Sequence, residues 1–399
     1  PDGYYVRTVD GIEWHFVIRN GEASVENQYY STAAIPDSTT GALTIPSAFG
    51  GCPVTRIGDC AFCRCTSIES IAIPSTVTSI GRLVFGECQG LGSVTIPSSV
   101  TNVEEGAFLN CSMLAEIIVA DGNVAYCSTD GVLYNKGRTV LIQCPAGKVG
   151  AVTIPATVSS VEWGAFASCS KLSAINVAEG NVAYSSRNGL LCNKEGAELI
   201  LCPVGKSGSL EIPTGIKYVQ PFAFNNCVGI TSVLIPSSVT DVGENAFGGC
   251  TGLVEVSIPS SVTGIGNGAF GACNGLKTIR VVKGDGERVK GLLSASGFDT
   301  SSVRFAEAGD RIVVECVAAD YFEGEVVELG VKLLDADGEP IINTQGGRLR
   351  MRDFLGVPVY FGHLTKAYMS DPKFMRERVG DYRWIDNRGE PFCKNVRFG

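Results

Sequence analysis

Two short motifs recur along the chain at fixed spacings, and this repetition constrains the fold more than any other feature of the sequence. Ile-Pro occurs in steps of 23 or 58 positions at Ile73-Pro74, Ile96-Pro97, Ile154-Pro155, Ile212-Pro213, Ile235-Pro236 and Ile258-Pro259. Ala-Phe-x-x-Cys, with Val84 replacing one alanine, keeps the same steps at Phe62/Cys65, Phe85/Cys88, Phe108/Cys111, Phe166/Cys169, Phe224/Cys227, Phe247/Cys250 and Phe270/Cys273. A unit this short cannot bury a hydrophobic face alone, so the sequence predicts stacked units that form a solenoid.

The 58-residue steps each contain one regular unit and one longer unit of about 35 residues. A second repetition with the same step supports this division: the segments 123–126, 131–136 and 144–148 recur as 181–184, 189–194 and 202–206. Each long unit is expected to add a β-hairpin, with turns at Asn135–Gly137 and Asn193–Gly196.

The segment Leu-x-x-Val-x-Ile has apolar residues at every second position and is rich in β-branched residues, which predicts a strand. The proline that follows lacks an N–H group and ends the strand. Ten strand ends are expected, near Ile45, Ile73, Ile96, Val119, Ile154, Val177, Ile212, Ile235, Ile258 and Val281. Ten parallel strands ~4.8 Å apart would make one sheet roughly 45 Å long. Val-Thr-x-Ile-Gly is expected to form a second extended piece on the opposite side, and Ala-Phe-x-x-Cys a single helical turn that buries its Phe.

The repeat unit resembles a known family. The string Ile-Pro-Ser-Ser-Val-Thr-Asp-Val-Gly-Glu-Asn-Ala-Phe-Gly-Gly-Cys-Thr-Gly-Leu at Ile235–Leu253 is similar to the BspA-like, or Treponema pallidum-type, leucine-rich repeats of bacterial surface proteins. The resemblance covers about residues 35–283. It implies a right-handed leucine-rich repeat solenoid of about ten coils with a curved parallel β-sheet. It also implies a secreted or cell-surface location, and several members of the family are adhesins for host matrix proteins or other bacteria.

The two ends of the chain differ from the repeats. Residues 1–34 are expected to form an N-terminal β-hairpin cap, because Ile12–Ile18 and Ala23–Val25 flank an Asn-Gly turn. Pro1 is not an initiator residue, so we expect that the chain was processed or trimmed and that a signal peptide does not lie within it. Charged residues rise from about 13% of residues 1–283 to about 30% of residues 284–399. We therefore assign residues 35–283 to the solenoid and 284–399 to a separate, mainly β C-terminal domain of unknown family.

The chain has 16 cysteines, and their positions favour buried, reduced thiols over a disulfide framework. Seven of them hold one equivalent position in the repeat, where pairing would break the regularity: Cys65, Cys88, Cys111, Cys169, Cys227, Cys250 and Cys273. Cys144 and Cys202 are expected to form a similar set in the long units. For Cys52, Cys60, Cys63 and Cys65, independent thiols are favoured, with one local disulfide or a zinc site as alternatives. A disulfide between Cys316 and Cys393 remains open.

No catalytic, cofactor-binding or metal-binding residue is predicted, and no cofactor is expected. A nucleophilic Cys316 or Cys393 with His363 as its base lacks any surrounding signature. Asp335-Ala-Asp337-Gly338 is interpreted as a turn and not as a calcium loop. The aromatic and arginine residues around 376–397 favour a solvated surface over an interface. The net charge of −9 argues against nucleic acid, and without an apolar run of about 18 residues no membrane insertion is expected.

The sequence therefore predicts a non-enzymatic protein- or glycan-binding adhesion protein of a bacterial surface or secretome. Its expected partner is a host matrix protein or a bacterial surface protein, because stacked repeats bind through their concave face. The residues predicted to line that face point outward from each strand: Ala72, Thr95, Ile118, Thr153, Asn176, Glu211, Leu234, Ser257 and Arg280. Two alternatives remain open, an enzyme or effector activity in residues 284–399 with the repeats as targeting scaffold, and a structural stalk.

Overall fold

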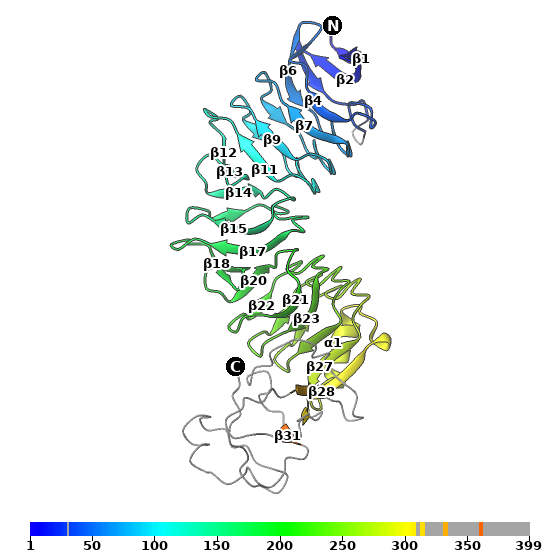
Figure 1. Ribbon diagram of the computed structural model, residues 1–399, viewed down its shortest axis with the longest axis vertical. Helices are drawn as coiled ribbons and strands as arrows, with labels where there is room; N and C mark the ends of the chain where they lie inside the picture. The colour runs from blue at the N-terminus through cyan, green and yellow to red at the C-terminus, as the bar shows by residue number, and fades with distance from the viewer. Residues whose placement is uncertain (30–31, 309–311, 316–329, 334–358, 362–399) are drawn as a thin grey trace, which may run out of the picture. The chain divides into compact units, whose positions relative to one another are not determined.

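The computed structural model describes residues 1–29, 32–308, 312–315, 330–333 and 359–361 of the chain (Figure 1). These residues fall into two compact units. The first comprises residues 1–256, 261–276 and 292–299, and the second comprises residues 257–260, 277–291 and those described from residue 300 onward. The first unit is a stack of coils, and the predicted solenoid is confirmed.

The first unit begins with three antiparallel strands, β1 (Gly3–Val9), β2 (Ile12–Arg19) and β3 (Glu22–Val25). Both connecting turns pair a non-glycine residue with glycine at positive φ, the geometry that favours two-residue hairpins; in the second, Asn20 has φ 53° and Gly21 has φ 79°. β3 then pairs in parallel with β6 (Cys52–Ile57), and Trp14 and Phe16 are fully buried. The predicted hairpin cap is confirmed and is extended by β1.

One side of the coils carries parallel strands, which we call the face sheet. The strands are β4 (Gly41–Thr44), β7 (Ile68–Ala72), β9 (Ser93–Ile96), β11 (Glu116–Val119), β15 (Gly150–Ile154), β17 (Leu172–Val177), β21 (Gly208–Glu211), β23 (Ile230–Leu234), β25 (Glu255–Ile258), β27 (Thr278–Val282) and β28 (Arg304–Ala308). They do not form one sheet. β4, β7, β9 and β11 make one group, β15 and β17 a second, and β21 begins a third. The expectation of a continuous sheet of ten strands was therefore wrong.

The sheet is interrupted because each long unit occupies a strand edge. The Ile117 N–H group donates to the Gly131 carbonyl at 2.9 Å, and the Val119 N–H group donates to Ser128 Oγ at 3.1 Å. The N–H groups of Ile117 and Val119 are the donors with which β11 would pair with the next strand of the face sheet, and here the hairpin occupies them. The same bonds recur in the second long unit, from Ile175 to Gly189 at 2.9 Å and from Val177 to Ser186 at 3.1 Å.

The long units form the predicted hairpins. The first contains β12 (Tyr126–Thr129), β13 (Val132–Asn135) and β14 (Val140–Gln143), and the second contains β18 (Tyr184–Arg187), β19 (Leu190–Asn193) and β20 (Glu198–Leu201). The predicted extended pieces on the opposite side are two-residue strands: β8 (Ser79–Ile80), β10 (Asn102–Val103), β16 (Ser160–Val161), β22 (Tyr218–Val219), β24 (Asp241–Val242) and β26 (Gly264–Ile265). β14 and β20 pair with β16 and β22, so the hairpins join this opposite side. The remaining strand, β5 (Ala48–Phe49), pairs with β6.

The Ala-Phe-x-x-Cys segments form successive turns, so the predicted single helical turn was wrong. Cys60 and Arg64 have φ values of 56° and 64°, which a right-handed helix does not allow. Alternate N–H groups donate to the next coil at 2.8–2.9 Å: Cys60 to Arg82, Phe62 to Val84 and Arg64 to Gly86. Stacking thus satisfies backbone groups that a helix would satisfy internally.

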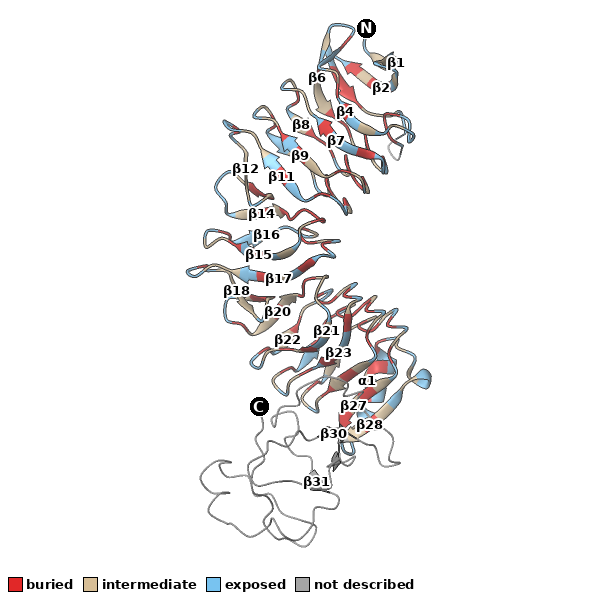
Figure 2. Ribbon diagram, in the orientation of Figure 1, coloured by how far each residue is buried: buried red, intermediate tan, exposed pale blue. Residues whose placement is uncertain are grey.

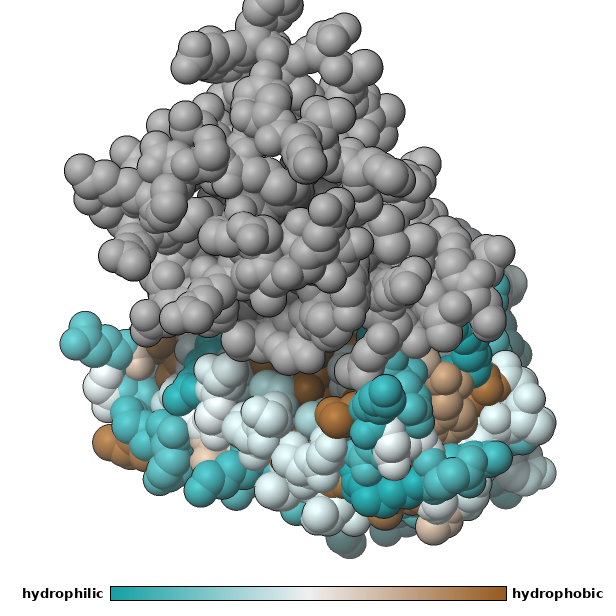
Figure 3. Space-filling view, turned by 90° about the horizontal axis from the view of Figure 1, so that it is seen from below, coloured by the Kyte–Doolittle hydropathy of each residue, from teal (hydrophilic) through white to brown (hydrophobic). Residues whose placement is uncertain are grey.

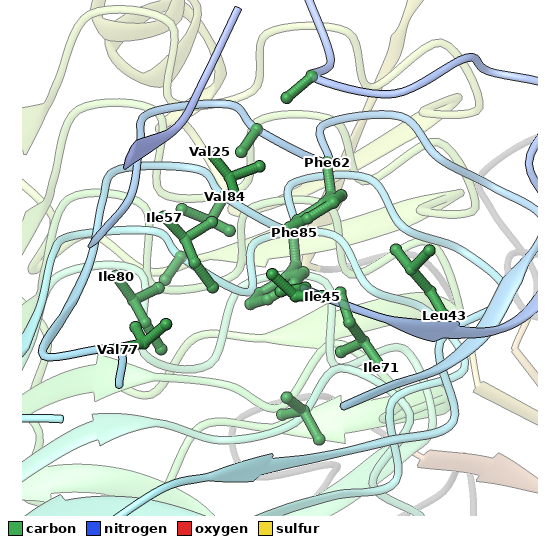
Figure 4. Packing of buried hydrophobic residues seen from close by; sticks show 14 of the residues in the cluster. Val25, Leu43, Ile45, Ile57, Phe62, Ile71, Val77, Ile80, Val84 and Phe85 are labelled. Atoms are coloured by element: carbon green, nitrogen blue, oxygen red, sulfur yellow. The ribbon is translucent and has the colours of Figure 1, made fainter. Parts of the chain in front are cut away.

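The core is a column of Phe rings and thiols. Figure 4 shows Phe62 and Phe85 between side chains of the face sheet, such as Ile71, and of the opposite side, such as Ile80. All seven repeat cysteines are buried and free, as are Cys144 and Cys202, which confirms the predicted reduced thiols. Six of the repeat cysteines contact a carbonyl oxygen of the preceding coil through Sγ, for example Cys88 to Phe62 at 2.9 Å.

Beyond residue 283, the predicted end of the solenoid, the chain contains further regular structure. α1 (Gly286–Ala295) and the short helix η1 (Thr300–Ser302) precede β28, which pairs in parallel with β27. Farther along, β29 (Ile312–Glu315) pairs with β30 (Gly330–Leu333) and β31 (Val359–Phe361). Within the described residues, no helix is both long and apolar enough to cross a membrane. The remaining predictions fall outside these residues; they concern Cys316, Asp335, Asp337, His363, Cys393 and the region 376–397.

Candidate binding groove

The nine residues predicted to point outward from the face sheet all reach solvent. Exposed and buried residues alternate along strands such as β9 and β15, and Figure 2 shows the ribbon coloured by burial. Six of the nine are exposed, namely Ala72, Thr95, Ile118, Thr153, Asn176 and Leu234, and three are half-buried, namely Glu211, Ser257 and Arg280. The inward/outward register derived from the sequence is correct.

The nine residues do not form one continuous row. Ile118 is the cross-strand partner of Thr95, Asn176 that of Thr153, and Leu234 that of Glu211. Between these pairs the ladder is interrupted. Ile118 and Thr153 lie on strands that do not pair, and the same holds for Asn176 and Glu211. The structure thus divides the predicted surface into separate patches.

A groove of ≈ 710 Å³ lies at the first interruption, between β11 and β15. It includes two of the predicted residues, Ile118 and Thr153. It is lined by Ala115, Glu116, Ile117, Ile118, Ser128, Asp130, Gly131, Lys148, Val149, Ala151, Val152 and Thr153. Its volume falls within the usual range for small-ligand sites, about 300–1,000 Å³. We call this site the face groove.

The walls of the face groove combine exposed apolar side chains with charges. Ile118 is 40% exposed and Val149 is 71% exposed. The carboxylates of Glu116 and Asp130 are on exposed residues, and the Lys148 ammonium donates to the backbone carbonyl of Asp130. With two carboxylates and one ammonium, the lining carries a formal charge of −1.

Gly131 fixes the shape of the groove. Its φ is +75°, and a Cβ atom there would lie 2.8 Å from Glu116 Cβ and 2.9 Å from Glu116 Cα. A side chain would push the hairpin away from β11 and break the Gly131–Ile117 bond. The long unit contributes this glycine at a place where regular units have no counterpart.

The second interruption repeats the backbone of the face groove with other side chains. Ala174, Asn188 and Lys206 take the places of Glu116, Asp130 and Lys148. Lys206 again donates to the carbonyl 18 residues earlier, that of Asn188, at 2.8 Å. The hairpin side of the second interruption therefore has no carboxylate.

A smaller pocket of ≈ 180 Å³ is lined from the opposite side by residues that include Glu105, Glu162 and Trp163. Trp163 is 84% exposed. Partial burial, with a smaller contribution from the charge of Glu105, raises the pKa of Glu162 above its ordinary value. Sequence reasoning missed this pocket. The available signal was Trp163, an aromatic residue at the repeat position where the preceding regular units carry the charged residues Arg82 and Glu105.

The described residues were also compared with the residue groups that bind metal ions. They contain no group of three or more His, Cys, Asp or Glu side chains able to hold a metal ion. In the view from below, the described residues that are visible mix hydrophobic and hydrophilic side chains and form no broad hydrophobic patch (Figure 3). Sequence reasoning found Ile118 and Thr153 from their period but missed Glu116, Asp130 and Lys148, because it treated the sheet as unbroken. The 58-residue step was the signal in the sequence that could have located these residues, because it marks where a long unit is inserted between two face strands.

Comparison with known proteins gives a family match. Residues 42–134, 144–192 and 205–287 match the model described as BspA type Leucine rich repeat region, in six copies. No curated protein matches the chain.

Several solved structures resemble the chain. Pneumococcal vaccine antigen PcpA is 17% identical, with a TM-score of 0.45, and the match covers 69% of this chain and 81% of that one. A leucine rich cell surface protein from Faecalibacterium prausnitzii is 22% identical over 77% of this chain and 95% of that one, with a TM-score of 0.41. For a T. pallidum leucine rich repeat protein, the identity is 18%, the coverages 73% and 96%, and the TM-score 0.26.

Proposed function

Since this chain belongs to the BspA-type leucine-rich repeat family, we propose that it is a non-enzymatic binding protein that takes up a protein partner on its face sheet. The proposed partner is a host matrix protein or a bacterial surface protein, and the proposed location is secreted or cell-surface. The observation that carries the proposal is the face groove, which places the outward residues Ile118 and Thr153 in one concave site of ≈ 710 Å³. A concave site with apolar walls and a few polar groups is the usual form of a binding site.

The test uses the whole chain against immobilised matrix proteins and intact bacteria. The triple variant Thr95→Arg/Ile118→Arg/Thr153→Arg fills the groove and its margin with bulky charge. These residues are exposed, so stability should change by under about 0.5 kcal/mol each. The matched control, Thr78→Arg/Thr101→Arg/Ser159→Arg, alters exposed residues on the opposite side.

We expect the face variant to lose binding by at least ten-fold and the control to bind as the unaltered chain does. Equal binding by both variants would remove the face sheet from the proposal. Binding by a fragment of residues 284–399 alone would instead support the alternative in which the C-terminal region carries the activity.

A glycan is a second candidate ligand, favoured by one observation. Trp163 has an exposed ring and lines the same pocket as Glu162. An aromatic ring next to polar groups suits a sugar, because a sugar ring combines an apolar face with polar hydroxyl groups. Glycan titration followed by tryptophan fluorescence tests this reading. A response that persists in Trp163→Phe would exclude this pocket.

A further inference from the structure

We propose that the partner enters the face groove as an extended, basic strand that hydrogen-bonds to the free edge of β15. This inference rests on the proposed function and specifies how the groove recognises its partner. Addition of a strand to an exposed sheet edge is a general mode of peptide recognition, in which main-chain bonds give affinity and side-chain positions give specificity.

The groove-facing edge of β15 is unpaired among the described residues. In a strand, the N–H and C=O groups of alternate residues point to opposite edges. Gly150 and Ile154 use the edge that faces β17, where Gly150 N–H donates to Lys171 and the Ile154 carbonyl accepts from Ala178. Ala151 and Thr153 consequently present their backbone groups to the groove. Both residues are exposed, and their backbone groups have no hydrogen-bond partner within the described part of the chain.

The other wall cannot take a strand in the same way. The N–H groups of Ile117 and Val119 on β11 are already bound by Gly131 and Ser128. The hairpin that closes this edge also holds β11 away from β15. The groove therefore offers one edge for pairing, and the outward side chains of a ligand strand paired there lie on the same face as the exposed residues of β11.

The charges of the other wall select the ligand. Glu116 and Asp130 are exposed acids, whereas the one ammonium of the lining, Lys148, donates to the Asp130 carbonyl. A Lys or Arg side chain of the ligand complements the carboxylates. The aliphatic stem of that Lys or Arg side chain fits against Ile118 and Val149, the exposed apolar side chains of the groove, and the intervening β-branched residues point to the other face of the ligand strand. The structure thus favours a segment that alternates basic and β-branched residues.

The second interruption supplies an internal control. Ser209 and Glu211 of β21 occupy the positions of Ala151 and Thr153. Ser209 Oγ accepts a hydrogen bond from Ser232 Oγ at 2.7 Å, and the hairpin side carries Ala174 and Asn188 in place of acids. On the hairpin side a basic strand meets no carboxylate, and the one acid of the facing strand, Glu211, is half-buried, so we expect the first interruption to bind it preferentially.

The experiment measures binding of a fluorescent, acetylated Thr-Val-Lys-Val-Lys-Val-Thr peptide to the full chain by anisotropy. Two probes are controls: the same peptide with Glu in place of Lys, and one N-methylated at alternate amides. Thr153→Pro removes one edge N–H, and proline is tolerated on an edge whose N–H faces solvent. Glu116→Gln/Asp130→Asn removes the charge, and Ala174→Glu/Asn188→Asp transplants it to the second interruption.

The unaltered chain should bind the Glu peptide and the N-methylated peptide at least ten-fold more weakly than the Lys peptide. The variants Thr153→Pro and Glu116→Gln/Asp130→Asn should bind the Lys peptide at least ten-fold more weakly than the unaltered chain does. The variant Ala174→Glu/Asn188→Asp should bind two Lys peptides per chain. If the Lys peptide binds but N-methylation and Thr153→Pro leave its affinity unchanged, strand pairing is refuted. Equal affinity in Glu116→Gln/Asp130→Asn overturns the charge selection, and a circular dichroism spectrum checks that each variant is folded. If the peptide fails to bind while the partner protein still binds in a manner abolished by the face variant, the inference falls and the proposed function stands.

Discussion

The rings of Phe224 and Phe247 lie with their centroids 4.6 Å apart and their planes inclined by 14°, and Phe270 continues the stack at 5.1 Å. Offset stacks of this kind add about 0.5–1.5 kcal/mol per pair to the burial of apolar area. Phe247 has a stacked ring on both sides and is fully buried. It therefore stabilises two neighbouring coils at once.

Replacing Phe247 with Ala should lower the free energy of unfolding by about 3–5 kcal/mol, the range for truncating a buried aromatic side chain. Urea unfolding followed by circular dichroism measures the change. Phe222→Ala is the matched control, because Phe222 is 44% exposed and should cost far less. Similar midpoints for the two variants would show that the stack does not support the coils.

Replacing Gly131 with Ala should destabilise the first hairpin, because Gly131 has φ +75° and a Cβ atom would meet Glu116 at 2.8 Å. Backbone strain at such a position costs about 1–3 kcal/mol before the steric contact is added. Gly137→Ala is the control, since the nearest atom to its Cβ is 3.8 Å away. Thermal unfolding should separate the two variants, and equal melting temperatures would contradict the close approach of hairpin and β11.

The buried thiols should resist alkylation in the native protein. Burial is the largest cause that raises the pKa of the Cys65 and Cys111 thiols to about 12, so little thiolate exists at pH 8. Mass spectrometry after treatment with N-ethylmaleimide should find the seven repeat cysteines unmodified in buffer and modified in urea. Cys127, which is partly exposed, serves as the reactive reference. Rapid native labelling of the repeat cysteines would refute their burial.

Stability should fall in alkaline solution for the same reason. The pKa of the Cys65 thiol is about 12 in the folded chain against an ordinary value of 9.0, so the folded state holds its proton more tightly than the unfolded state. The contribution is fully present below about pH 9 and is lost as the pH rises toward 12. Urea midpoints measured from pH 8 to 10.5 should decline, and Cys65→Ala should show a shallower decline. Parallel declines would assign the effect to other groups.

Replacing Asn123 with Ala should cost about 2–4 kcal/mol, because its amide is buried and makes four hydrogen bonds. The side-chain nitrogen donates to Pro97 and Val100 carbonyls at 2.8 and 2.9 Å, and the oxygen accepts from the N–H groups of Ala125 and Tyr126. Thermal unfolding tests the loss. Asn102→Ala, at an exposed asparagine, should shift the melting temperature much less.

The periods of the sequence predicted the coils, the hairpins and the outward register of Ile118 and Thr153. They could not predict the interruption of the sheet, which depends on where the Gly131 carbonyl lies in space. They also could not separate a helical turn from the observed turns, since both place Phe62 and Cys65 three positions apart on the inner side. The difference lies in the alternate N–H groups of Cys60, Phe62 and Arg64, which bond to carbonyls of the next coil, whereas those between them bond within their own turn. Glu116 and Asp130 meet only because the hairpin folds against β11.

The two 58-residue blocks have a consequence for how this protein changes length. The side-chain amide of Asn181 donates to the carbonyls of Pro155 and Val158. Asn123 makes the same two hydrogen bonds to the residues 26 and 23 positions before it, so the two blocks make the same contacts with the coil that precedes them. Removing or duplicating one whole block would join surfaces that already fit. A gene that gained or lost such a segment in frame would encode a shorter or longer molecule with intact coils, and the number of interruptions, each a site with its own charges, would change by one at every step.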